Sequence, residues 1–336
     1  MKIKRFIIFL SLILFNSFFS CQKAKEQAIS IHRDQDVWRV KAGGQSFTAL
    51  VFKSQYHKPV LYPVFDALGN EITRGWPVNP REGERVDHPH HIGVWMNHGD
   101  VNNIDFWNNS EAIPANKKHE YGSIIPDSVW SKENKLVFNA HWLANDTVFI
   151  EEHTIYEFFA YDSARVINRT TTWNAQKNIT IEDSKEGMFA IRVSRALEQP
   201  YLDENQEILK KGKVVKASFD DKMDAGGLYL NKEGLTGDAV WGERSPWVVL
   251  FSLNDNYGTH VMIADHPENF NYPAHWMARG YGLFAVNPLG TSVYDKNSDP
   301  KPLILKKGEE VTFKYSLIIS NRLNPDYEEM YNEFIE

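Results

Sequence analysis

The run from Leu136 to Trp142, Leu-Val-Phe-Asn-Ala-His-Trp, places a large or apolar side chain at every second position, beginning with Leu136. Successive side chains of a β-strand point to opposite faces, so a period of two indicates a strand with one apolar face. Residues 311–319 and 165–173 show the same alternation. Further candidate strands are residues 47–52, 59–65, 147–159, 178–183, 187–194, 247–253, 258–265 and 281–287.

Turn signals separate these strands, among them Gly43-Gly44, Asn145-Asp146 and Asn254-Asp255-Asn256. Many strands at hairpin spacing, with few helices, favour antiparallel sheets over a parallel α/β sheet. No Pro/Ser linker and no fixed repeat divides the chain after residue 30. The sequence therefore predicts an all-β fold, a large antiparallel β-sandwich of supersandwich or jelly-roll type, as a single domain over residues 31–336.

One helix is predicted at the C-terminus. Asn324 can cap it, Pro325 suits its first turn, and the apolar side chains from Tyr327 to Ile335 recur with a period of 3.6. We expect this helix to pack against an outer sheet face and to carry no chemistry.

The first 21 residues resemble a lipoprotein export signal. A basic start at Lys2, Lys4 and Arg5 precedes an apolar run that is short for a membrane span, and Ser20 precedes Cys21, the only cysteine. We expect lipidation at Cys21, a polar tether over residues 22–30, and a periplasm-facing membrane anchor, with the cell surface as the alternative location. An ordinary signal peptide with an incidental cysteine is the competing interpretation.

Composition excludes several partners and chemistries. The formal charge is −7 and no Lys/Arg block occurs, which argues against nucleic acid and leaves the N-terminal lipid as the only expected membrane contact. Dinucleotide, phosphate-loop, nucleophile-elbow and His-Glu-x-x-His motifs are absent from the sequence. Ten tryptophans and fourteen tyrosines include more aromatic rings than a core requires, and exposed rings beside His and Asp bind sugars.

Residues 85–107 hold four of the twelve histidines together with three aspartates. If the segment is extended, as Pro89 favours, His88 and His90 point one way and His91 the other. Such a pair can bind a divalent metal, with His98 or Asp100 as a third ligand, or can act as acid, base and hydrogen-bond donor toward a sugar. A purely structural role, in which Asp87 and Asp105 orient the histidines, stays open. Trp95 and Trp107 are core residues, sugar platforms or one of each.

Two further stretches carry candidate groups. Before the strand at 187–194, Glu186 is a candidate general base, with a solvated acidic loop as the alternative. Arg279 can pair with a carboxylate of the substrate or of the protein, and a loop held together by its own side chains is the alternative there. The other polyol-binding candidates in this third region are Arg244, His266, Asn269, His275, Trp276 and Tyr281.

Several motifs, in order, resemble the bacterial family labelled methane oxygenase PmoA. They are Tyr62-Pro63, Asp87-His-Pro-His-His-x-Gly-x-Trp95, His98-Gly-Asp-Val-Asn102, Asp105-Phe-Trp107, Glu186-Gly187, Trp241-Gly-x-Arg-x-Pro-Trp247 and the stretch from Asp265-His-Pro to Pro288. The resemblance spans residues 50–320 and implies a setting of sugar utilisation. It does not imply oxygenase activity, because a membrane oxygenase subunit needs several spans. A weaker resemblance, at the level of fold, is to galactose mutarotase-like supersandwiches.

These observations predict an exported protein that acts on carbohydrate as a hydrolase, lyase or epimerase. The expected catalytic residues are His88, His90, Glu186, His275 and Arg279. The expected substrate-binding residues are His91, Trp95, His98, Asp100, Trp107, Arg244, His266, Asn269, Trp276 and Tyr281. No cofactor is expected, with a divalent metal at His88 and His90 as the alternative, and the rival functions are a non-catalytic sugar-binding lipoprotein and a metal-dependent cupin-like enzyme. All of them require the three stretches to meet at one cavity.

Overall fold

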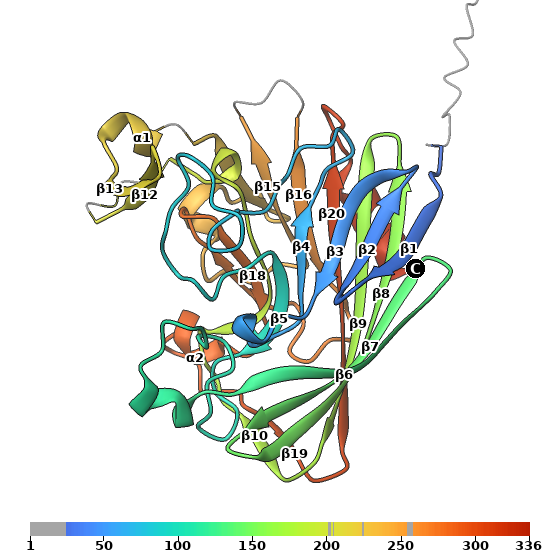
Figure 1. Ribbon diagram of the computed structural model, residues 1–336, viewed down its shortest axis with the longest axis vertical. Coiled ribbons are helices and arrows are strands. Elements are labelled where there is room, and N and C mark those ends of the chain that lie inside the picture. Colours follow the sequence, from blue (N-terminus) through green and yellow to red (C-terminus); the bar gives the residue numbers. More distant parts are fainter. Residues whose placement is uncertain (1–24, 201–202, 204, 224, 254–257) are drawn as a thin grey trace, which may run out of the picture.

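Two large antiparallel sheets, each of eight strands, form the body of the protein (Figure 1). The computed structural model describes residues 25–336 except 201, 202, 204, 224 and 254–257. The expected export signal, Cys21 and the first residues of the tether lie outside the described residues. The architecture confirms the predicted all-β sandwich with a C-terminal helix, and the first strand begins at Ile29, just before the expected domain start.

The first sheet brings together strands from the N-terminal third and from the second half of the chain. In spatial order its strands are β1 (Ile29–Asp34), β2 (Val37–Ala42), β3 (Gln45–Val51), β4 (Val60–Val64), β5 (Val94–His98), β11 (Gly187–Arg192), β18 (Leu283–Asn287) and β17 (His275–Ala278).

The second sheet is built mainly from consecutive hairpins. In spatial order its strands are β14 (Gly227–Asn231), β15 (Trp247–Ser252), β16 (His260–Asp265), β20 (Glu310–Ser320), β9 (Ala164–Ala175), β8 (Thr147–Tyr161), β7 (Lys135–Ala144) and β6 (Ser123–Lys132).

Smaller elements complete the described chain. Two-stranded sheets are formed by β10 (Ile179–Ile181) with β19 (Leu303–Leu305) and by β12 (Glu207–Lys210) with β13 (Lys213–Lys216). The helices are α1 (Phe219–Met223), α2 (Thr291–Tyr294) and α3 (Tyr327–Ile335), with 3-10 turns η1 (Ser54–Tyr56), η2 (Ala115–Glu120), η3 (Arg195–Leu197) and η4 (Gly237–Val240). The β12–β13 hairpin and α1 form a lobe that projects from the sandwich at the upper left of Figure 1. None of the helices among the described residues has the length and apolar character needed to cross a membrane.

The main core lies between the two sheets. Phe47 of β3 contacts Phe158 of β8 with ring centroids 5.7 Å apart, and Phe189 of β11 stacks on Tyr315 of β20 at 5.3 Å. In β7 the alternate side chains from Leu136 to Trp142 are all buried, as the period of two predicts.

Strand β9 buries arginine on its core face. Arg169 is compensated there because its Nη2 lies 2.7 Å from Oε1 of Glu152 and its Nε donates to Thr171 at 2.7 Å. A buried charge needs such a partner, since desolvation of an unpaired ion is costly. The alternation predicted for residues 165–173 is therefore confirmed, with buried polar side chains among its members.

Helix α3 covers the outer face of the second sheet, where Tyr331 joins Trp247, Val249, Met262 and Ile318 in an apolar cluster. The predicted packing is confirmed, but the predicted cap is wrong. The cap is Asp326 instead of Asn324, because the Asp326 carboxylate accepts a hydrogen bond from the backbone N–H of Glu329 at 3.0 Å.

The outer face of the first sheet carries another apolar cluster, which includes Trp95, Trp107, Ala190, Met277 and Leu283. Residues from loops and short helical turns belong to this cluster or pack against it, among them Tyr281, Tyr56 of η1 and Tyr294 of α2.

Candidate functional site

The segment from Asp87 to His91 is a tight turn. His88 has a φ of +44°, and the N–H of His91 donates to the carbonyl of His88 at 3.0 Å. The predicted extended conformation is therefore wrong, and the three imidazoles gather on one side instead of alternating.

The buried side chain of Arg74 stabilises this turn through hydrogen bonds. Its Nη1 donates to the carbonyl oxygen and to Oδ1 of Asp87, at 2.8 and 2.6 Å, and its Nη2 donates to the carbonyls of His88 and His91, at 2.9 and 3.1 Å. Burial, together with the neighbouring Arg192, lowers the pKa of Arg74 to about 9. Nothing in the sequence around Arg74 signals this role, which explains why sequence reasoning missed it.

A second buried arginine, Arg192 of β11, fixes Asp87 and His91. Its Nη2 lies 2.7 Å from Oδ1 of Asp87, and its Nη1 donates to Nδ1 of His91 at 3.2 Å. Because arginine can only donate, the proton of His91 sits on Nε2. Burial lowers the pKa of His91 well below its usual value. Burial alone would raise the pKa of Asp87, but Arg192, His88 and Arg74 hold it well below the usual range.

The imidazoles belong to a run of nearly parallel rings. His88 is parallel to Tyr281 and to His91, with centroids 5.2 and 4.8 Å apart, and His91 stacks on Trp95 at 5.3 Å. Trp95 is fully buried, as is Trp107 beside it. Both tryptophans thus support the histidines from the core, which is the first of the two roles left open by the sequence.

Lys58 is a further buried group beneath the turn that sequence reasoning missed. Its Nζ donates to the carbonyl of His90 at 2.7 Å and lies 5.5 Å from the centroid of the Trp95 ring. Burial lowers the pKa of Lys58 to about 7. Burial, followed by the nearby charge of Lys58, lowers the pKa of His90 to about 2, so the His90 imidazole is neutral at physiological pH.

The other two stretches reach this turn because β5, β11, β18 and β17 are neighbours in the first sheet. Glu186 immediately precedes β11, and a quarter of its side chain is exposed, with Oε1 3.4 Å from Nζ of Lys185. Gly99 permits this position, since a Cβ there would lie 2.5 Å from Cβ of Glu186. Arg279 and Tyr281 come from the turn that joins β17 to β18.

A pocket of about 110 Å³ lies where the three stretches meet. It is lined by His88, His90, His91, Asn108, Lys185, Glu186, Met277, Arg279, Tyr281 and Leu283. Four of the five expected catalytic residues and two of the expected substrate-binding residues, His91 and Tyr281, line it. Asn108, which sequence reasoning missed, donates through its Nδ2 to Asp105 at 2.8 Å.

Arg279 is held in place without an acidic partner. Its guanidinium carbon lies 4.6 Å from the centroid of the Trp241 ring, and its backbone N–H donates to the carbonyl of Leu283 at 2.9 Å. Within the described part of the chain, no carboxylate lies within ion-pair distance of this guanidinium, and its buried Nε has no hydrogen-bond partner.

Three predicted residues lie near the pocket but do not line it. Nδ1 of the buried His275 donates to the carbonyl of Gly242 at 2.7 Å, and its ring stacks on Tyr294. His98 is fully buried and contacts the backbone of Asp100 through Nδ1 at 3.1 Å. The Asp100 carboxylate accepts from the N–H of Asn103 at 2.9 Å. These contacts are structural.

The remaining predicted residues contact other parts of the protein. Arg244 donates to the carbonyl of Asn271 at 2.9 Å. Nδ2 of Asn269 donates to Asp265 at 2.7 Å. The buried Trp276 donates to the carbonyl of Ser245 at 2.9 Å, and His266 meets Phe334 of α3 edge to face. None of the four lines the pocket, and their contacts reach beyond the loop itself, to Ser245, Lys314 and Phe334.

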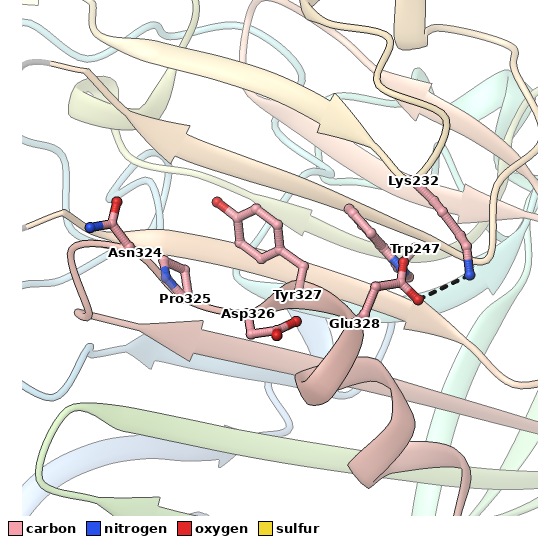
Figure 2. Close-up of a pocket in the computed structure, with 7 residues that line it drawn as sticks. All are labelled: Lys232, Trp247, Asn324, Pro325, Asp326, Tyr327 and Glu328. Carbon is pink, nitrogen blue, oxygen red and sulfur yellow. Dashed lines mark hydrogen bonds and ion pairs between the residues drawn. The ribbon is translucent and has the colours of Figure 1, made fainter. Parts of the chain in front are cut away.

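A larger hollow of about 560 Å³ lies beside the start of α3 (Figure 2). Its two carboxylates are both engaged: Glu328 accepts from Nζ of Lys232 at 3.0 Å and from Nε1 of Trp247 at 3.1 Å, and Asp326 caps α3. The seven lining residues drawn in Figure 2 include no histidine. The histidine pocket is therefore the stronger candidate site.

Metal ligation was the alternative role for His88 and His90. Their rings meet edge to face with centroids 5.8 Å apart. In the described residues, no group of three or more His, Cys, Asp or Glu side chains is arranged to hold a metal ion.

Solved structures that align with this chain include proteins named for galactose or galactoside chemistry. The α-galactosidase AgaA from Geobacillus stearothermophilus, of glycoside hydrolase family 36, is 11% identical with a TM-score of 0.38 over 88% of this chain and 41% of that one. A galactose mutarotase-like protein from Lactobacillus casei is 11% identical with a TM-score of 0.38 over 87% and 99%. A galactose mutarotase-related enzyme from Lactobacillus acidophilus is 9% identical with a TM-score of 0.32 over 89% and 99%. This chain thus spans about two fifths of the α-galactosidase, and with all these TM-scores below 0.5 we transfer no chemistry from them.

No curated protein is similar enough in sequence to count as a relative. Residues 37–334 match a family of unknown function, DUF6807. Since that match covers most of the chain, the protein belongs to the DUF6807 family.

Proposed function

We propose that this protein acts on carbohydrate by acid–base chemistry in the histidine pocket. One observation carries the proposal: His88, His90, Glu186 and Arg279, from three distant stretches, line the same small cavity. A carboxylate and imidazoles around one cavity are the groups that proton transfer at a sugar requires.

The two histidines have different roles in this proposal. Nδ1 of His88 lies 3.3 Å from Oδ1 of Asp87, whose carboxylate is held by two buried arginines. That contact orients the ring and leaves Nε2 for proton exchange with a substrate. His90, neutral because of its low pKa, donates or accepts a hydrogen bond instead of carrying charge.

Glu186 is the proposed base. Its carboxylate is partly exposed and paired with a single flexible lysine, so it can approach a substrate. Hydrolysis, elimination and epimerisation each use one group that removes a proton and one that supplies it. Glu186 with His88 meets that need.

The size of the pocket limits the ligand. A volume of about 110 Å³ is well below the roughly 300–1,000 Å³ of pockets for drug-sized ligands. We infer that one sugar ring, or the end of a glycan, enters while the remainder of the ligand stays outside.

The cellular setting is part of the proposal. The basic start, apolar run and Cys21 support export and lipid anchoring at the periplasmic face. The resemblance to the family labelled methane oxygenase PmoA stays a prediction, and what it contributes is a setting of sugar utilisation.

The test is turnover of a glycan panel, read by mass spectrometry, with Glu186→Gln and His88→Gln variants. We expect both to abolish product formation while thermal unfolding stays cooperative. His153→Gln is the matched control, because this surface histidine contacts Asn139 on β7 and is not among the residues that line the pocket. Full activity in both pocket variants would refute the assignment, and bound but unaltered glycan would instead establish the sugar-binding lipoprotein.

A further inference from the structure

Arg279 lines the pocket, and none of the carboxylates in the described part of the chain forms an ion pair with its guanidinium. Arginine is the side chain best suited to bind a planar anion through two parallel N–H donors. Leaving such a group partly buried and unpaired is costly, and the buried Nε of Arg279 has no partner among the described residues. The sequence left open whether Arg279 pairs with the substrate or with the protein, and the second of these is absent from the described structure.

The side chain is also prepared for binding before a ligand arrives. The Trp241 ring lies against one face of the guanidinium at 4.6 Å. The Arg279 backbone is fixed by two hydrogen bonds to the turn, from its own N–H to Leu283 and from the N–H of Gly282 to its carbonyl, both at 2.9 Å. The phenol of Tyr229 donates to the same carbonyl at 3.2 Å. A pre-oriented donor loses little conformational entropy on binding.

The charges around the pocket favour an anion as well. The charged residues that line the pocket are Lys185, Glu186 and Arg279, and Asp87, which pairs with the lining residue His88, is itself bound by the two buried cations Arg74 and Arg192. This local positive excess occurs in a protein whose formal charge is −7. Arg74 and Arg192 share the carboxylate of Asp87 and Lys185 pairs with Glu186, so among these described cations Arg279 is the one without a carboxylate partner.

We propose that Arg279 binds the carboxylate of an acidic sugar, a uronate, and that the pocket therefore selects anionic over neutral carbohydrate. This inference rests on the proposed carbohydrate function and names its substrate class. One monoanionic carboxylate matches one unpaired guanidinium, while Glu186 in the same pocket disfavours a dianionic phosphate. Sulfate and phosphate esters share the anionic chemistry and serve as separate arms of the test.

The experiment is titration calorimetry with galacturonate, glucuronate and their short oligomers, against the corresponding methyl esters and neutral sugars. We expect the esters and the neutral sugars to bind about 10- to 100-fold more weakly, the range for losing charge-assisted hydrogen bonds. Arg279→Gln should remove the preference, and Arg279→Lys should retain part of it because the charge remains while the fork is lost. Arg39→Gln, at an exposed arginine paired with Asp34, should change nothing.

Several results would overturn the inference. Equal affinity for uronate and methyl ester would do so on the unaltered protein, whether or not the variants fold. So would the absence of binding to every uronate tested, or a preference for the sulfated or phosphorylated sugar over the uronate. Uronate binding that depends on Arg279 but yields no product would support this inference while refuting the catalytic proposal. Turnover of a neutral glycan at a rate that Arg279→Gln does not change would refute this inference while supporting the catalytic proposal.

Discussion

Replacing Asp87 with asparagine tests the arrangement on which the histidine turn depends. The change preserves shape and removes one negative charge. In the native structure the side chains of Arg74 and Arg192 are fully buried, and both contact Oδ1 of Asp87, at 2.6 and 2.7 Å. The variant leaves two buried guanidinium groups with neutral partners only.

Removing one partner of a buried ion pair costs roughly 3–5 kcal/mol. Asp87 is 30% exposed, so water compensates part of the loss and the lower end applies. We therefore expect Asp87→Asn to lower the free energy of unfolding by about 3 kcal/mol, against a total of roughly 5–15 kcal/mol for a natural domain. Asp34→Asn, which breaks an exposed pair with Arg39, should cost at most about 1 kcal/mol.

The assay is urea denaturation followed by tryptophan fluorescence, repeated across pH. Because the folded state lowers the pKa of Asp87, the carboxylate stabilises the protein above its ordinary pKa of about 4. That contribution is lost as the pH falls toward the lower folded pKa. The gap between native protein and variant should accordingly be constant near neutrality and shrink in acid. If Asp87→Asn costs no more than Asp34→Asn at neutral pH, the charge arrangement beneath the histidines is not as described.

Three further predictions concern the neighbours of the turn. The pKa of Lys58 is lowered to about 7 in the folded protein, so above that pH the unfolded chain binds more protons than the folded chain. The free energy of unfolding should therefore rise with pH, by up to about 1.4 kcal/mol per pH unit, until about pH 10. Lys58→Met should abolish this slope in urea titrations. Gly99→Ala should cost about 1–3 kcal/mol and reduce turnover, since its Cβ would lie 2.5 Å from Cβ of Glu186; an unchanged midpoint and rate would contradict the position of Glu186. Chelation with EDTA should leave uronate binding unaltered in calorimetry, and restored binding on adding back a divalent ion would favour the metal alternative instead.

The sheets could be predicted because their signal is local. A period of two in residues 136–142 records which face each side chain presents, and burial in β7 follows it except at Val137, which is buried as well. The pairing of strands could not be read in the same way. β5 lies beside β11, and β11 beside β18, through contacts between residues about 90 positions apart along the chain, and no local pattern encodes such partners.

The same limit explains which site residues were found. Histidines and a glutamate beside a glycine are conspicuous in composition, and they do line the pocket. Arg74 and Lys58 are single cations in unremarkable surroundings, and their importance comes from what the fold places over them. His98, His275 and Trp276 look equally functional in the sequence, but their hydrogen bonds go to backbone groups in the buried parts of the loops and sheet.

The conformation of the histidine segment shows how a distant residue overrides a local preference. Pro89 favours an extended His88, yet the structure has His88 at a φ of +44°. Left-handed backbone at a residue other than glycine is unfavourable by itself, so the surrounding structure must compensate it. Arg74 does so with four hydrogen bonds to Asp87, His88 and His91. The turn, and with it the side on which the imidazoles gather, therefore depends on a buried guanidinium on another segment, supported by Arg192 and Lys58. The chemistry of the pocket thus depends on residues that do not line it.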